Sequence, residues 1–265
     1  MITAIACRRI HNAFGFALFC LVSADTFAQT PAPPSAPTLP SIATDRPTFS
    51  DCAFLVPTGH WQFEAGTTAN TISGSTSNTY GELITRYGIS SRIEFRIANV
   101  TWTHAPGESD GLQDPQAGFK FWLQTGSSKR PDLAAEVVTT IPVGGSSFTV
   151  NRSQPTAKLL WNQQVDANTS IAGNFVASDL GPTGSRFTQY AASTFLTRTL
   201  TLKLSLFGEV FRVDPYTYAG SSASFYDAGV TYLINDNLQL DARFGAGFDP
   251  QTNGRTVGAG ISYRY

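Results

Sequence analysis

Charged side chains are scarce in this sequence. Asp, Glu, Lys and Arg make up 14% of its 265 residues, whereas soluble domains carry about 25%. The formal net charge is −1, so nothing favours a nucleic-acid partner. Outside the N-terminus, no apolar run reaches the roughly 20 residues that a membrane-spanning helix needs. With a mean hydropathy of −0.08, two classes remain: a secreted β-sandwich, or a membrane barrel whose apolar and polar residues alternate.

Cysteine and histidine are equally rare. Of the three cysteines, Cys7 and Cys20 belong to the N-terminal region and only Cys52 lies in the body of the chain. A single remaining thiol excludes an internal disulfide framework. The body holds only His60 and His104, with no cysteine cluster beside them. We therefore expect no metal site and no cofactor.

The N-terminus has the features of an export signal. Arg8 and Arg9 precede the apolar run "AFGFALFCLVSA", and small residues follow it up to Ala28. This order is typical of a cleaved secretory signal peptide. The next residues, 29–43, are rich in proline and are expected to form an extended periplasmic linker. The predicted organisation is a signal peptide over 1–28, this linker, and one β-domain over 44–265.

Apolar and polar residues alternate through most of that domain. "SRIEFRIAN" sets Ile93, Phe95 and Ile97 against arginine and glutamate, and "NLQLDARFG" repeats the pattern. A period of two indicates β-strands with one apolar face, and no window of similar length has the spacing of an amphipathic helix. The last ten residues, "TVGAGISYRY", follow the same alternation and end on an aromatic ring.

The connections between strands alternate between tight turns and longer loops. Short turns are expected near 87–92, 165–168, 196–200 and 233–238, and loops near 73–78, 104–114, 144–154, 178–186, 214–222 and 249–254. This alternation is typical of outer-membrane barrels. The sequence therefore predicts an all-β fold: a closed antiparallel transmembrane β-barrel of about twelve strands. Its last strand pairs with its first, and its apolar face meets lipid.

The alternation also predicts which charged residues face the interior. The candidates that line the lumen are Glu64, Glu82, Arg86, Glu94, Arg96, Lys120, Glu136, Lys158, Lys203, Glu209, Asp227, Asp241, Arg243 and Arg264. Both signs are interspersed, so strong ion selectivity is not expected. These charges could pair with one another and block a narrow barrel, or they could line a polar pore. The sequence leaves both alternatives open.

The same alternation predicts which face of the wall each aromatic residue occupies. Most of the 19 phenylalanines fall on the lipid side, where barrels carry apolar wall residues and aromatic girdles. A minority fall on the interior side: Tyr80, Trp122, Phe207, Phe211 and Phe225. An apolar patch inside a barrel could receive an aromatic or hydrophobic solute.

One short motif resembles a hydrolase signature. "GESDG" (107–111) fits the G-x-S-x-G pattern around Ser109, and His104 is close by. That motif works as a nucleophile only between a strand and a helix. Here it falls in a predicted loop between strands, so no catalytic residue is expected. A membrane-embedded hydrolase remains the second alternative.

Several motifs together resemble a known family. They are "TDRPTFS" (44–50), "VPTGHWQFEAG" (56–66), "GELITRYGISSRIEFRI" (81–97) and "INDNLQLDARFGAGF" (234–248). With them the chain resembles the outer-membrane β-barrel family named for the MetA (meta-cleavage) pathway of phenol degradation. Cys52 stands where this resemblance leads us to expect a small polar residue. The resemblance implies uptake of aromatic compounds, and it supplies no catalytic or binding residues.

The sequence therefore predicts a monomeric barrel in the bacterial outer membrane, with the lipid bilayer as its partner. Its expected role is passive transport of small solutes, aromatic or hydrophobic ones included. The first alternative is a structural or adhesive barrel that transports nothing. The sequence leaves open which solute is transported and whether the proline-rich segment enters the lumen as a plug.

Overall fold

The computed structural model describes residues 39–249 and 252–265. The predicted signal peptide and most of the predicted linker lie outside these residues. In the part of the chain that is described, no helix is long and apolar enough to span a membrane.

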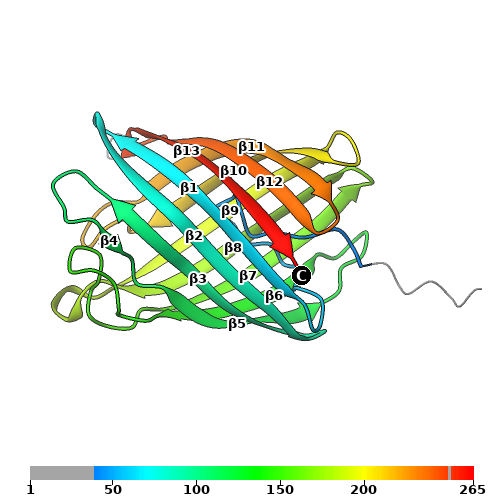
Figure 1. Cartoon of the computed structure of the whole chain (residues 1–265), viewed down its shortest axis with the longest axis horizontal. Helices are drawn as coiled ribbons and strands as arrows, with labels where there is room; N and C mark the ends of the chain where they lie inside the picture. Colours follow the sequence, from blue (N-terminus) through cyan, green and yellow to red (C-terminus); the bar gives the residue numbers. More distant parts are fainter. Residues whose placement is uncertain (1–38, 250–251) are drawn as a thin grey trace, which may run out of the picture. The chain divides into compact units, whose positions relative to one another are not determined.

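Most of the described chain forms β-strands, which wind around the barrel in sequence order (Figure 1). They are β1 Trp61–Ile72, β2 Ser75–Ser90, β3 Ile93–His104, β4 Gly111–Leu112, β5 Gln116–Gln124, β6 Asp132–Thr140, β7 Pro155–Asp166, β8 Thr169–Leu180, β9 Phe187–Thr199, β10 Leu204–Asp214, β11 Ala223–Asn235, β12 Leu238–Gly247 and β13 Gly254–Arg264. Twelve of them form the wall, and β4 is a two-residue strand beside β3.

The barrel is closed by the pairing of its first and last strands. β1 and β13 run antiparallel, with Gln62 opposite Arg264 and Ile72 opposite Gly254. The other neighbours pair in chain order, apart from β4. Closure leaves no free backbone edge in the wall, which a barrel in lipid requires. The predicted closed antiparallel barrel of about twelve strands is confirmed.

The two ends of the barrel differ. Both Leu39 and Tyr265 lie at the end with the shorter turns, where Arg264 donates a hydrogen bond to the Pro40 carbonyl. We call this the turn end. The opposite end, called the loop end, carries the connections 105–115, 141–154, 181–186, 215–222 and 248–253.

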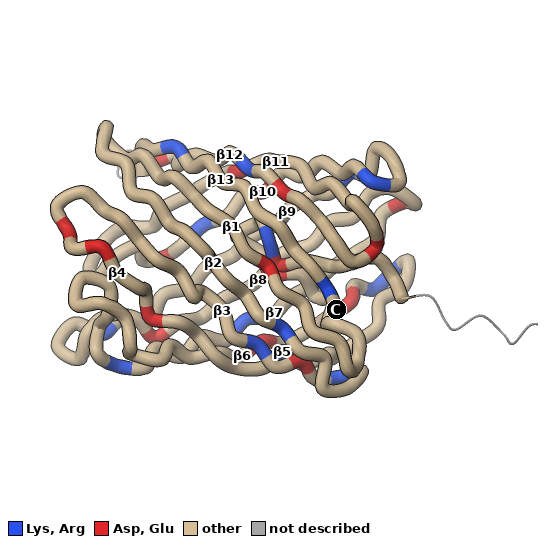
Figure 2. The backbone as a smooth tube through the Cα atoms, in the orientation of Figure 1, with Lys and Arg blue, Asp and Glu red and all other residues tan. Residues whose placement is uncertain are grey.

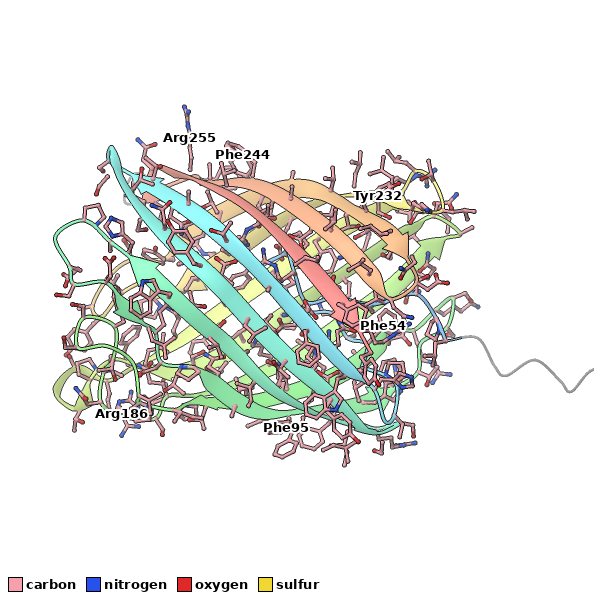
Figure 3. All side chains as sticks on the ribbon, viewed as in Figure 1. Phe54, Phe95, Arg186, Tyr232, Phe244 and Arg255 are labelled. Atoms are coloured by element: carbon pink, nitrogen blue, oxygen red, sulfur yellow. The ribbon has the colours of Figure 1, made fainter. Side chains whose placement is uncertain are left out.

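Alternation along the strands separates an apolar outside from a polar inside. On β10, Leu206 and Val210 are exposed while Phe207 and Glu209 are buried. Figure 3 shows Phe95, Phe244 and Tyr232 pointing away from the wall. At the turn end, Trp61 packs on Tyr87 with ring centroids 4.6 Å apart. The outer surface therefore has the apolar belt and aromatic rim expected of a barrel in a bilayer.

Two predicted connections are wrong. Residues 73–78 were expected to form a loop, but Ser73 and Gly74 make a tight turn in which both have positive φ (50° and 82°), and β2 starts at Ser75. The turn expected over 196–200 instead covers 200–203, because β9 continues to Thr199. Lys203 consequently lies in this turn, exposed, and its ammonium donates to the Ile234 carbonyl. It does not line the lumen.

Tyr80 also differs from its predicted orientation. It lies opposite Trp102, and both rings are about half exposed on the outer surface. The register between β2 and β3 shifts just after Tyr80, where Gly81 and Glu82 have positive φ. A bulge of this kind reverses which face successive residues occupy. The alternation of faces counted from the rest of β2 therefore assigns Tyr80 to the wrong face.

Residues 39–60 do not belong to the wall. They enter at the turn end, run through the interior and return to the turn end, where the Gly59 amide donates to the Gly88 carbonyl of β2 before β1 begins at Trp61 (Figure 1). Ile42, Asp45, Ser50, Ala53 and Val56 are all buried there. We call this segment the plug. The wall thus begins at Trp61, and most of the plug belongs to the domain predicted over 44–265.

Candidate functional site

The centre of the barrel holds a buried carboxylate contributed by the plug. Asp45 lies 2.9 Å from the Arg96 guanidinium and 3.1 Å from the Lys120 ammonium, and Arg86 is 3.6 Å away. These three cations project from β2, β3 and β5. One plug side chain therefore bridges three wall strands, and all four groups are almost completely buried.

Arg86 connects the plug to the wall in a second way. Its guanidinium donates to Glu64 at 3.0 Å and to Glu94 at 2.9 Å on the neighbouring strands. It also donates to the plug carbonyls of Ala43 and Phe54. Arg86 is 0% exposed. A buried cation needs this number of acceptors, because it has no water to replace them.

The carboxylates of the wall hold plug backbone groups in return. Glu64 accepts from the amides of Asp45 and Arg46, both at 2.9 Å, and Glu94 accepts from Val56 at 2.8 Å. Hydrogen bonds to charged acceptors contribute about 1.5–3 kcal/mol each. The plug is therefore fixed through its backbone as well as through Asp45.

A group of three carboxylates could in principle share a cation. Oxygen atoms of Asp45, Asp51 and Glu136 lie within 4.8 Å of one another. Four wall cations already contact this group: Arg86, Arg96, Lys120 and Lys158. The arrangement is an ion-pair network, and nothing in it points to a metal.

The plug has a second set of contacts nearer the loop end. Arg46 pairs with Glu82 and lies 3.5 Å from Asp241. Its guanidinium packs beside Gly66, where a Cβ atom would collide with it. Glu209 accepts from the backbone amides of Phe49 at 2.7 Å and Ser50 at 3.0 Å. Charged wall residues therefore also hold the part of the plug that lies nearer the loop end.

All the predicted lumen residues except Lys203 lie inside the barrel. Ten of them are nearly inaccessible: Glu64, Arg86, Glu94, Arg96, Lys120, Glu136, Glu209, Asp227, Asp241 and Arg264. The side chains of Glu82, Lys158 and Arg243 are 16–21% exposed. Figure 2 shows that positive and negative residues are interspersed along the barrel. The central pairs match the predicted charge-paired alternative more closely than an open polar pore.

Sequence reasoning did not assign the plug charges. Asp45, Arg46 and Asp51 precede the first strand and belong to no alternating pattern. The available signal was the dense polar motif "TDRPTFSD", which carries three charges in eight residues of a chain with few charges. Such a motif in a membrane barrel is a candidate for the interior, because the outer face is in lipid.

Cavities lie on both sides of the central network. Toward the loop end, one of about 500 Å³ is bounded by Arg46, Phe49, Lys158 and Arg243, and a second of about 400 Å³ is bounded by Phe49, Phe211, Phe225 and Asp227. A third, of about 510 Å³, lies at the turn end against Phe54, Val56 and Trp122. Each cavity could hold a small organic molecule.

Cys52 reports on the position of the plug. Burial raises the pKa of the Cys52 thiol to about 12, and the nearby Asp45 carboxylate adds to the rise. Because only the thiolate reacts, a shift from 9.0 to about 12 should slow alkylation on the order of a thousandfold. We expect maleimide to label Cys52 slowly in the folded barrel, with Cys7 and Cys20 replaced by Ser. Unfolding in urea should restore fast labelling, and equally fast labelling of the folded barrel would show that the plug is not seated.

The Ser109 region does not form a nucleophile elbow. His104 Nδ1 lies 2.7 Å from Asp110 Oδ1, and both side chains are about half exposed, His104 at the end of β3 and Asp110 in the loop that follows. The described chain continues from this loop into β4 and β5, not into a helix. The strand–turn–helix context that the motif requires is therefore missing at this position.

The sequence matches a family model over residues 44–265, under the description "Putative MetA-pathway of phenol degradation". This match includes both the plug from Thr44 onward and the whole wall. The chain belongs to this family. The resemblance in the sequence motifs is thereby confirmed. No curated protein matches the chain significantly.

Solved structures share the fold of this family member at low sequence identity. The COG4313 outer membrane channel from Pseudomonas putida F1 aligns with a TM-score of 0.62 and 13% identity, over 79% of this chain and 97% of that chain. The KdgM porin in complex with disordered oligogalacturonate aligns with a TM-score of 0.52 and 11% identity, over 76% and 98%. This chain is therefore an outer-membrane-type barrel that resembles channel and porin proteins.

Proposed function

We propose that this protein is an outer-membrane channel for small solutes, aromatic ones included, and that the plug closes it in the state described. The observation that carries this proposal is the arrangement of cavities on both sides of one removable segment. The plug is joined to the wall by ion pairs and hydrogen bonds, so it can leave without breaking a strand. The family description, which refers to phenol degradation, supports an aromatic solute.

Membrane location and oligomeric state are parts of the same proposal. Exposed apolar residues surround the wall, among them Val137, Leu159, Phe175, Leu206, Val257 and Ile261. A surface of this kind is stable in a bilayer and would aggregate in water. Closure of the sheet within one chain favours a monomer, exported through the predicted signal peptide. No catalytic role is proposed.

The filled centre of the barrel favours a second candidate function. The charges around Asp45 are paired and buried, as they would be in a barrel that only strengthens the membrane or displays its loops. This candidate requires that the plug never leave. It therefore predicts that the barrel does not conduct.

Single-channel recording separates the two functions. We expect the refolded full chain to be closed for most of the time, with discrete openings, in a planar bilayer. A chain that lacks residues 39–60 should be open for most of the time, because the wall starts at Trp61 and keeps its closure. Simple phenols should block the open variant transiently. If the shortened barrel inserts but never conducts, the channel proposal fails and the structural barrel is supported.

A further inference from the structure

An aromatic ring of the plug is stacked on aromatic rings of the wall. The Phe49 and Phe211 centroids are 4.2 Å apart with an interplanar angle of 2°. Phe211 in turn stacks on Phe225, its register partner on β11, at 4.8 Å. Phe49 is thus the last ring of a three-ring stack, and it is the only one of the three that the plug contributes.

Unsatisfied polar groups lie beside this stack. Asp227 is 6% exposed, and its Oδ1 atom accepts no hydrogen bond within the described structure. Arg243 Nε likewise donates none, and the nearest atoms of this pair are 4.0 Å apart. Buried polar atoms without partners are unusual in proteins, and these two atoms could bind a polar group of a ligand. Both residues line the same 400 Å³ cavity as Phe49, Phe211 and Phe225.

Phe49 separates two spaces in the interior. It lines both the 400 Å³ cavity and the 500 Å³ cavity, and 37% of its surface remains exposed. Its backbone amide is bound by Glu209, and its ring has no polar atom to engage Asp227. A solute ring that took its place on Phe211 could satisfy Asp227 as well, if it carried a hydroxyl group.

We propose that the face of Phe211 is the binding subsite for a flat hydroxylated aromatic solute, and that this solute opens the channel by displacing Phe49. The ring of the solute stacks on Phe211, its hydroxyl donates to Asp227, and Arg243 donates to the hydroxyl oxygen. This inference rests on the proposed function, since it names the solute class and the way in which the solute releases the plug.

The coupling between binding and opening follows from competition for one surface. The solute and Phe49 cannot both occupy the Phe211 face, so the solute binds only when Phe49 is displaced. A ligand shifts an equilibrium by its difference in affinity for the two states. The coupling is reciprocal: removing Phe49 should strengthen solute binding. In Phe49→Ala the solute no longer competes with the Phe49–Phe211 stack, so this variant should bind phenol about 3- to 10-fold more tightly.

The test uses Cys52 as the only thiol in the otherwise complete chain. Maleimide labelling is followed in the presence of phenol, of toluene, which lacks the hydroxyl, and of cyclohexanol, which lacks the aromatic ring. We expect phenol to accelerate labelling in a saturable manner, toluene to do so less, and cyclohexanol to have no effect. Equal acceleration by toluene would overturn the assigned role of Asp227.

Variants test the subsite directly. Phe211→Ala should raise the basal labelling rate, since Phe49 loses its stack, and should abolish the dependence on phenol. Asp227→Asn should reduce the preference for phenol over toluene. Phe175→Ala serves as a matched control, because this phenylalanine is 58% exposed on the outer surface of β8. It should behave like the unmodified chain.

Different results would contradict the Phe211 subsite and the channel function. If phenol leaves labelling unchanged, or accelerates it equally in Phe211→Ala, the subsite is overturned. In that case, conductance of the chain lacking residues 39–60 still establishes the channel. If that shortened barrel is silent as well, the proposed function fails together with the inference.

Discussion

Replacing Asp45 with Asn should release the plug and convert a mostly closed barrel into a mostly open one. The substitution keeps the size of the side chain but removes the negative charge that faces Arg86, Arg96 and Lys120. Breaking a buried ion pair on one side costs about 3–5 kcal/mol. The ratio of closed to open barrels should therefore fall by roughly 100- to 5000-fold, as measured by single-channel open probability.

A matched substitution separates this effect from a general loss of charge. Asp179 also pairs with two arginines, Arg152 and Arg186, but at the loop end and partly in solvent. Exposed ion pairs contribute about 0–1 kcal/mol, so Asp179→Asn should leave the open probability nearly unchanged. Equal, low open probability in both variants would mean that Glu64 and Glu209 hold the plug without Asp45.

The same carboxylate predicts how the closed state responds to acid. Burial alone would raise the pKa of Asp45, but the attraction of Arg86, Lys120 and Arg96 outweighs it and holds the pKa well below its usual value. A group with a lowered pKa stabilises the folded arrangement above its ordinary pKa of about 3.9, and this contribution is lost only in stronger acid. Asp45 should therefore keep its charge, and its contribution to the closed state, at pH 5 as at pH 7.

The wall was predictable from the sequence because its physical constraints are local. Each strand residue faces either lipid or the interior, so a period of two identifies Glu209 as internal and Val210 as external. The predictions failed where the period is interrupted. The bulge at Gly81 and Glu82 reversed Tyr80, and a hairpin turn displaced by a few residues placed Lys203 outside the lumen.

The plug could not be predicted in this way, because its contacts are long-range and follow no period. Asp45 meets Lys120, 75 residues away, and Arg46 meets Asp241, 195 residues away. Proline and irregular backbone in residues 39–60 allow many paths through the barrel, and only the charges of the wall select one. The sequence showed the charged wall and the motif "TDRPTFSD" separately. Their pairing required the three-dimensional structure.

Replacing Arg86 with Met should lower the stability of the whole barrel, and not only the binding of the plug to the wall. Arg86 is the shared partner of Glu64 and Glu94, which lie on the strands that flank β2. Methionine leaves both buried carboxylates without this cation, at a cost of about 3–5 kcal/mol. The midpoint of urea unfolding in detergent or lipid should fall accordingly. Arg198→Met should change the free energy of unfolding by less than about 1 kcal/mol, because Arg198 pairs with Asp166 in solvent.

A second substitution decides whether the loss arises from the unpaired carboxylates. Glu94→Gln in the Arg86→Met background removes one of the two uncompensated charges, so the double variant should regain part of the lost stability. Coupling between contacting residues is typically about 0.5–3 kcal/mol. Without such a recovery, the loss would reflect the missing hydrogen bonds from Arg86 to Ala43 and Phe54. An unchanged midpoint in Arg86→Met would mean that water enters and solvates Glu64 and Glu94. The centre of the barrel would then be a hydrated passage, even with the plug in place.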